Sequence, residues 1–249
     1  MSDVLAKLRA QTAARVGLGR CGNGMPTAPL LAFQAAHARA RHAVHDSLDF
    51  EKLSAELADL HPIVVASRVR DRREFLQRPD LGRRLRPEDG ARLPPGPFDV
   101  AFVLADGLSA SALQAHGPPV LRQTISALRG WRVAPVVVAN QARVALGDDI
   151  ASCMGAIAVA VLIGERPGLA AADSLGVYVT WRPRIGTTDG ARNCISNIHG
   201  RGMSHEEAAA RLVWLLENAK AKGYTGVALK DEYRVPEPAR PELSSSSAS

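Results

Sequence analysis

The chain has 249 residues, of which 46% are hydrophobic and only 4% aromatic, so its core must be built mainly from Ala, Val, Leu and Ile. The longest apolar run, residues 156–163, is far shorter than the about 20 residues of a transmembrane helix, so no membrane association is expected. The N-terminus carries no signal-peptide pattern. Three widely spaced cysteines, Cys21, Cys153 and Cys194, argue against a disulfide framework and for a reducing cytoplasm.

The net charge of +6 raises the possibility of nucleic-acid binding, but the distribution of the charge argues against it. The basic residues are spread along the chain, and the densest stretch, residues 68–86, also contains Asp71, Glu74 and Asp80. That stretch offers only one aromatic ring, Phe75, on which a base could stack. We therefore expect no nucleic acid as a partner, and instead an arginine-rich surface that faces an acidic partner subunit.

The first part of the chain, residues 1–95, is expected to form a mainly helical N-terminal region. Apolar residues recur at helical spacing up to Val16, and residues 29–47 form an Ala-rich helix. Residues 17–22 match GxGxxG, but no strand precedes them, as a dinucleotide-binding fingerprint requires, so they predict a flexible connection. The Pro- and Gly-rich stretch at 93–97 is the clearest linker.

After this linker, apolar strand-like runs alternate with helical segments. Strands are predicted at residues 98–105, 133–139, 156–163 and 174–181. Helices are predicted after an N-cap at Ser109, then at 118–128 with Pro118 in its first turn, at 148–154 and at 204–222. This alternation is typical of an α/β fold with a parallel sheet covered on both faces. The Pro- and Ser-rich tail at 234–249 is expected to be disordered.

Polar loops follow each predicted strand, at residues 106–109, 140–144, 164–168 and 182–188. If the strands are parallel, these loops meet at one edge of the sheet, which is where ligands bind in open α/β folds. Glu165 follows an apolar strand directly and so needs a partner. It can accept hydrogen bonds from ligand amides, or it can pair with Arg166, Arg182 or Arg184 and join loops; the spacing favours neither.

Other chemical interpretations of these loops are weaker. Cys194 and His199 invite a thiolate–imidazole hypothesis, and adding His205 gives a metal-site hypothesis that lacks any known ligand spacing. Residues 106–109 could bind a phosphate, although Asp106 favours a strand-to-helix turn. We expect no metal site and no catalytic residue in this chain. The hard chemistry then belongs to a cofactor or to another subunit.

Six motifs give the chain a specific family resemblance, which extends from about Leu8 to Leu229. They are residues 8–16, residues 17–22, RPDLGRRL at 78–85, DGLS at 106–109, GERPGL at 164–169 and CISNIH at 194–199. In this order they resemble the small (light) subunit of ethanolamine ammonia-lyase. Each motif alone is a weak signal, but their order over more than two hundred residues makes a strong match.

The resemblance implies a Rossmann-like domain, here residues 96–233, preceded by the helical region. It implies a large-subunit partner that holds the substrate, and adenosylcobalamin as the cofactor, clasped between the two subunits. The enzyme would convert ethanolamine to acetaldehyde and ammonia by a radical mechanism. Matched motif to motif, the cofactor contacts fall on Val144, Glu165 and Cys194.

Two further expectations follow from the sequence. Because the matching region begins within the first ten residues, a plain cytoplasmic enzyme is expected rather than one packaged in a bacterial microcompartment. A nicotinamide-dependent oxidoreductase is disfavoured by the missing strand before residues 17–22. The remaining alternative is a noncatalytic cobalamin- or nucleotide-binding α/β protein.

Overall fold

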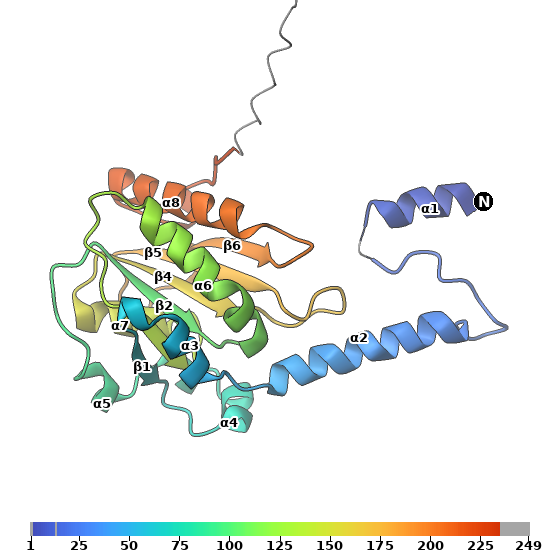
Figure 1. Cartoon of the computed structure of the whole chain (residues 1–249), viewed down its shortest axis with the longest axis horizontal. Helices are drawn as coiled ribbons and strands as arrows, with labels where there is room; N and C mark the ends of the chain where they lie inside the picture. The colour runs from blue at the N-terminus through green and yellow to red at the C-terminus, as the bar shows by residue number, and fades with distance from the viewer. Residues whose placement is uncertain (1, 13, 235–249) are drawn as a thin grey trace, which may run out of the picture.

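The structure is a computed structural model that describes residues 2–12 and 14–234. Beyond Arg234, the tail expected to be disordered lies outside the described residues. The helices are α1 (Ser2–Ala10), α2 (Thr27–His45), α3 (Phe50–Glu56), α4 (Arg72–Gln77), α5 (Pro87–Gly90), α6 (Ala110–Ala127), α7 (Leu146–Met154) and α8 (His205–Lys222). The strands are β1 (Ile63–Ala66), β2 (Val100–Ala105), β3 (Val137–Asn140), β4 (Ala158–Gly164), β5 (Leu175–Trp181) and β6 (Asn193–Ile198). The predicted α/β class is confirmed (Figure 1).

The six strands form one mixed sheet in the order β1-β3-β2-β4-β5-β6. The first four strands in this order are parallel, as expected, but β5 runs antiparallel to β4, and β6 antiparallel to β5. The prediction of a wholly parallel sheet is therefore wrong, since the predicted strand at residues 174–181, which is β5, runs antiparallel to β4. Parallel neighbours need a long crossover, usually a helix, and the chain between β4 and β5 contains none.

Two of the strands were missed by the sequence analysis. Strand β1 is a short element within the region expected to be helical, and it pairs with β3 at one edge of the sheet. Strand β6 contains most of the CISNIH motif, for which no strand was predicted, and only Ile195 and Ile198 of this strand are buried. A strand that hides so few apolar side chains gives a weak periodic signal.

Helix α6 begins where Ser109 predicts it, since the backbone amide of Ala112 donates to the Ser109 hydroxyl at 3.3 Å. However, α6 continues through Pro118 and Pro119, so the prediction of a separate helix starting at Pro118 is wrong. The prolines leave two carbonyls one turn earlier without amide donors. Those carbonyls belong to the more exposed side of α6, where water can reach them.

Helices cover both faces of the sheet centre. On one face α6 packs over alternate residues of β2 such as Phe102 and Leu104, and α8 packs beside α6 over β5 and β6, where its apolar side is buried. On the other face α7 packs over the intervening residues, such as Val103. Apart from this body, α2 projects as a long arm with α1 folded back beside it (Figure 1). No helix in the described part of the chain is long and apolar enough to cross a membrane.

Candidate functional site

A pocket of about 450 Å³ lies beyond the carboxyl ends of β2, β3 and β4. The chain leaves β2 for α6 on one face of the sheet and leaves β3 for α7 on the other face. The carboxyl ends of two such strands open a crevice, which is the usual ligand site of an open α/β sheet. The pocket is lined by Gly107, Leu108, Arg143, Val144, Ile163, Gly164, Glu165, Arg166 and Tyr178. Three of the four predicted polar loops therefore meet, as expected.

Asp106, at the end of β2, holds two of these loops together. Its carboxylate accepts hydrogen bonds from the backbone amides of Gly107, Gln141 and Ala142 at 2.9–3.0 Å, and Arg72 lies 3.5 Å away. Burial raises the pKa of Asp106 to about 6, although the three amides and Arg72 act in the opposite direction. Asp106 accepts a hydrogen bond from the Gly107 amide within the turn, and the Ser109 hydroxyl caps α6, so the turn-and-cap interpretation of residues 106–109 is confirmed.

Arg143 is fixed at the pocket wall by contacts with α4 and with the 3-10 turn Leu81–Arg83. Its backbone amide donates to Gly82 at 2.8 Å, and its guanidinium donates to the carbonyl of Phe75 at 3.1 Å. The guanidinium groups of Arg72 and Arg143 both lie over the Phe75 ring, at 4.7 and 4.2 Å from its centroid. Cation–π contacts of this kind restrain Arg143 and position the neighbouring Val144 at the pocket. The sequence did not single out Arg143.

Glu165 lies where β4 ends and is tied to the neighbouring strands rather than to an arginine. Its Oε2 accepts a hydrogen bond from the Ser174 hydroxyl at 2.5 Å and a long one from the Asn197 amide at 3.4 Å. Its Oε1 accepts no hydrogen bond from the described residues. This oxygen lies beside Gly176, where an added Cβ atom would be 2.9 Å away from it. The salt-bridge alternative with Arg166, Arg182 or Arg184 is therefore not what the structure contains.

Cys194 does not line the pocket itself but lies next to a residue that does. It is paired with Tyr178 across β5 and β6, and its thiol hydrogen-bonds to the Tyr178 hydroxyl. Although the residue as a whole is exposed, desolvation of the thiol raises the pKa of Cys194, and desolvation also raises the pKa of Tyr178. Both side chains therefore stay neutral at physiological pH. A neutral thiol does not act as a nucleophile.

The histidines of the alternative hypotheses have other partners. His199 bonds to the Asn197 side chain at 2.8 Å, and His205 bonds to His116 at 2.9 Å. Neither is a hydrogen-bond partner of Cys194 in the described structure. No group of three or more His, Cys, Asp or Glu side chains among the described residues is arranged to hold a metal ion. The thiolate–imidazole pair and the three-residue metal site are thus not assembled.

Comparisons with known proteins identify the family of this chain. The family model of the ethanolamine ammonia-lyase light chain matches residues 2–230. The chain belongs to the ethanolamine ammonia-lyase light-chain family. It is 52% identical over 236 residues to the ethanolamine ammonia-lyase small subunit of Rhodopseudomonas palustris (strain BisA53), covering 92% of this chain and 90% of that protein. It is 48% identical over 237 residues to the small subunit of Rhodococcus erythropolis, covering 93% and 91% of the two chains. With the small subunit of Azotobacter vinelandii it shares 49% identity over 243 residues, covering 92% and 88%.

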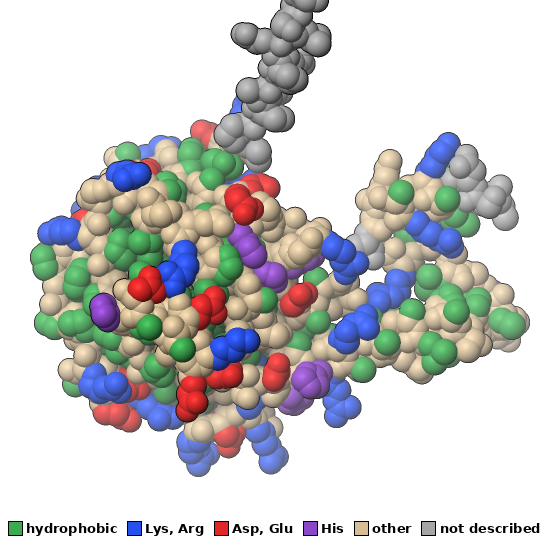
Figure 2. Space-filling view, viewed as in Figure 1, with side chains coloured by type: hydrophobic (Ala, Val, Ile, Leu, Met, Phe, Trp, Pro, Cys, Tyr) green, Lys and Arg blue, Asp and Glu red, His purple; other side chains and the backbone are tan. Residues whose placement is uncertain are grey.

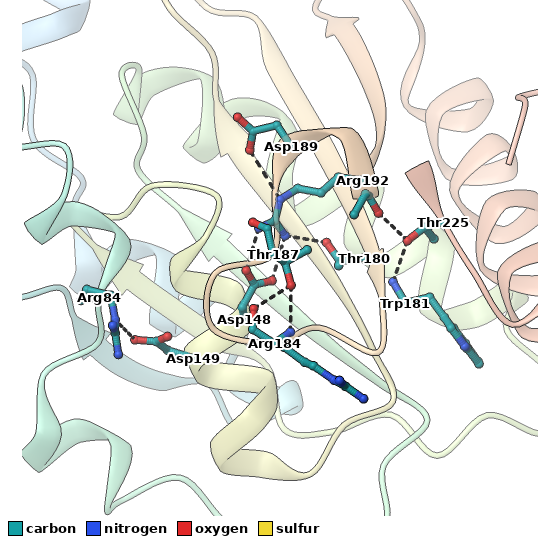
Figure 3. Close-up of polar contacts among 11 residues, drawn as sticks. Arg84, Asp148, Asp149, Thr180, Trp181, Arg184, Thr187, Asp189, Arg192 and Thr225 are labelled. Atoms are coloured by element: carbon teal, nitrogen blue, oxygen red, sulfur yellow. Dashed lines mark hydrogen bonds and ion pairs between the residues drawn. The ribbon is translucent and has the colours of Figure 1, made fainter. Parts of the chain in front are cut away.

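In this member of the light-chain family, a buried ion pair supports the sheet beside the pocket. The guanidinium of Arg192 makes two hydrogen bonds, of 2.8 and 2.6 Å, to the carboxylate of Asp148, and both side chains are 1% exposed. The same guanidinium donates to the Thr180 hydroxyl at 2.7 Å and to the Thr187 carbonyl at 2.8 Å (Figure 3). One arginine thereby joins α7, β5 and the loop before β6. The sequence analysis missed this pair because its members are 44 residues apart.

The His116–His205 pair leads to a prediction about pH. Burial lowers the pKa of His116, and the neighbouring His205 and His199 act in the same direction while Asp173 opposes them. The unfolded chain, with an ordinary histidine pKa near 6.5, therefore takes up the proton more readily than the folded chain. Stability from this group is complete above about pH 6.5 and is lost as the pH falls below it.

We expect the His116→Gln variant to lose less stability than the unmodified protein between pH 7.5 and pH 5.5. Urea denaturation at several pH values measures this difference. The matched control is His45→Gln, which changes an exposed histidine at the end of α2. Parallel pH profiles for His116→Gln and the unmodified chain would show that the pair does not titrate with folding.

Proposed function

We propose that this chain is the small subunit of an adenosylcobalamin-dependent ethanolamine ammonia-lyase, which converts ethanolamine to acetaldehyde and ammonia together with a large subunit that holds the substrate. The observation that carries the proposal is the family match over residues 2–230, combined with a pocket whose lining includes Val144 and Glu165. When bound, the cofactor supplies a radical by homolysis of its cobalt–carbon bond. The described residues of the pocket contain no assembled nucleophile or metal site, which fits chemistry that a cofactor provides.

The pocket residues suit the rim of a corrin ring, which is an apolar disc fringed with amides. Val144 offers apolar contact, and Oε1 of Glu165 is an acceptor that an amide N–H can use. Cys194, as a neutral thiol behind Tyr178, contributes contact and backbone groups rather than charge. A volume of about 450 Å³ is at the small end of ligand pockets and cannot enclose a whole cobalamin. The remaining cover would come from the large subunit.

Three finer assignments belong to the same proposal. The run β2–α6–β3–α7–β4 supports a Rossmann-like arrangement, with residues 96–233 as the cobalamin-contacting domain and residues 1–95 as the preceding, mainly helical region. The strand β1 would be the contribution of that region to the sheet. The free thiols of Cys21, Cys153 and Cys194 support a cytoplasmic location, since thiols stay reduced there.

The first test is reconstitution with the large subunit from the same source, followed by measurement of acetaldehyde formed from ethanolamine. We expect activity that needs both chains and adenosylcobalamin. Activity that persists when this chain is omitted would instead make it a noncatalytic binding protein.

The Glu165→Gln variant tests the cofactor contact. A hydrogen bond to a charged group contributes about 1.5–3 kcal/mol, so we expect the adenosylcobalamin concentration for half-maximal activity to rise roughly tenfold to a hundredfold. The matched control is Glu51→Gln, an exposed carboxylate in the first turn of α3, which should leave that concentration unchanged. An unchanged cofactor requirement in a folded, assembled Glu165→Gln enzyme would remove Glu165 from the contact.

A further inference from the structure

The N-terminal arm, defined as residues 4–45, carries the excess positive charge of the whole chain. Six of the 31 Lys and Arg residues lie in the arm, and none of the 25 acidic residues does. The rest of the chain therefore has 25 basic and 25 acidic residues and is balanced. The six basic residues of the arm are Lys7, Arg9, Arg15, Arg20, Arg39 and Arg41.

The arm also exposes large apolar side chains. In α2, Leu31 is 59% exposed, and only Ala36 and Ala43 are buried. Six of the twelve exposed large hydrophobic side chains of the described structure lie in the arm: Val4, Leu8, Met25, Leu30, Leu31 and Phe33. On the face shown in Figure 2, apolar side chains gather towards the far end of the arm, and basic side chains lie between them and the body. Such a concentration of apolar surface on a projecting segment marks an interaction site.

Carboxylates pair with three arginines of the other basic stretch, whereas the described contacts of Arg9 and Arg15 in the arm are with carbonyl groups. In residues 68–86, Arg70 pairs with Glu74, Arg78 with Asp80 and Arg84 with Asp149. In the arm, by contrast, Arg9 donates to the carbonyls of Val16 and Gly17, and Arg15 donates to the carbonyl of Leu169. These contacts leave both positive charges without a carboxylate partner. The arm therefore fits an acidic surface better than residues 68–86 do.

The arm also lies beside the candidate site. A second pocket, of about 490 Å³, is formed between α2 and the loop after β4. Its α2 side includes His37 and Arg41, and it shares Leu108, Arg143 and Arg166 with the candidate site. A protein that covered the arm would therefore reach the edge of the first pocket.

We propose that the arm docks on the large subunit, at a surface where acidic side chains surround an apolar groove. That the partner is the large subunit rests on the proposed function. That its surface is acidic around an apolar groove is inferred from the basic and apolar side chains of the arm. A second copy of this chain is a poorer occupant, because its arm has the same charge and its remainder is balanced. A membrane surface is also a poorer occupant, because Leu30, Leu31 and Phe33 precede Arg39 and Arg41 along α2 instead of lying on an opposite face.

The test compares two arm variants of the full chain in titrations with the purified large subunit, followed by analytical ultracentrifugation. One variant, Arg20→Glu with Arg39→Glu, reverses charge; the other, Leu30→Ser with Leu31→Ser, removes apolar surface. We expect each to raise the Kd for subunit association at least tenfold, and the charge variant to reduce the dependence of Kd on salt. The matched controls on the body are Arg73→Glu with Arg129→Glu, and Val227→Ser, which are exposed and should change Kd less than twofold.

The outcomes separate the two proposals. If the unmodified chain binds the large subunit and both arm variants bind it equally well, the arm inference is wrong and the proposed function stands. If the unmodified chain does not bind the large subunit at all, both are overturned. In a third outcome, anionic vesicles or duplex DNA retain the unmodified chain but not the charge variant, while the subunit Kd is unchanged. That result would assign the arm to one of those partners and also overturn the inference.

Discussion

Arg192→Met is expected to lower the free energy of unfolding by about 3–5 kcal/mol, because it leaves the buried carboxylate of Asp148 without its partner. Methionine fills much of the space of the arginine stem, so the loss arises mainly from charge and hydrogen bonding. The variant also removes the donors to Thr180 and Thr187. Urea denaturation at pH 7.5 measures the change.

The pH dependence of this variant identifies the cause. Burial already raises the pKa of Asp148, and Arg192 opposes that rise, so removing Arg192 raises the pKa of Asp148 further. A folded carboxyl with a raised pKa contributes stability below its unfolded pKa and loses it as the pH rises through the folded pKa. We therefore expect the deficit of Arg192→Met to shrink as the pH is lowered from 7.5 towards 5.

Two control variants complete this experiment. Arg192→Met combined with Asp148→Leu should recover much of the lost stability, because replacing both members of a buried pair removes the uncompensated charge. Arg78→Met breaks a pair with Asp80 whose side chains are more than half exposed, and should have no measurable effect. A deficit in Arg192→Met no larger than that of Arg78→Met would contradict a stabilising role for the buried pair.

Gly164→Ala is expected to destabilise the fold by about 3 kcal/mol, at the upper end of the cost of overpacking. A Cβ atom at Gly164 would lie 1.9 Å from the Ser109 carbonyl oxygen and 2.8 Å from that of Asp106. Both neighbours are backbone atoms, which cannot rotate away as a side chain can. The turn between β2 and α6 must then move away from β4. The hydrogen bond of 2.9 Å from the Leu108 amide to the Gly164 carbonyl opposes this movement, because it joins the turn to β4.

Because Gly164 lines the pocket, this displacement should also affect the site. We expect the cofactor concentration for half-maximal activity to rise in whatever fraction of the variant still assembles with the large subunit. Gly190→Ala is the matched control, since nothing lies within 4 Å of a Cβ atom there, and stability and activity should be unchanged. Equal unfolding midpoints for the two alanine variants would show that the turn tolerates the added atom.

The elements predicted well from the sequence are those whose signal is local. Strands β2 and β4 are continuous apolar runs that are buried on both faces, and α8 follows an N-cap at Ser204, which accepts from the Glu207 amide. The strands that were missed, β1 and β6, are stable only through their neighbours in the sheet. The direction of β5 and β6 also depends on those neighbours, and no local pattern specifies it.

The same distinction applies to the site. That Val144 and Glu165 would lie near each other could be predicted, because both follow strands that end at one edge of the sheet. That Tyr178 would separate Cys194 from the pocket could not, since it depends on the antiparallel register of β5 and β6. The roles of Phe75 and Arg192 likewise depend on contacts between residues far apart in the sequence.

The position of β1 has a consequence for attempts to isolate the pocket. The linker at residues 93–97 invites a fragment that starts at residue 96, yet such a fragment would lack β1 and expose the backbone edge of β3. It would also lose Phe75, which supports Arg143, and Ser67, which donates to the Gln141 carbonyl at 2.6 Å. Unpaired strand edges promote self-association. Ligand screening, soaking or labelling of this pocket therefore requires a chain that retains everything from β1 onward.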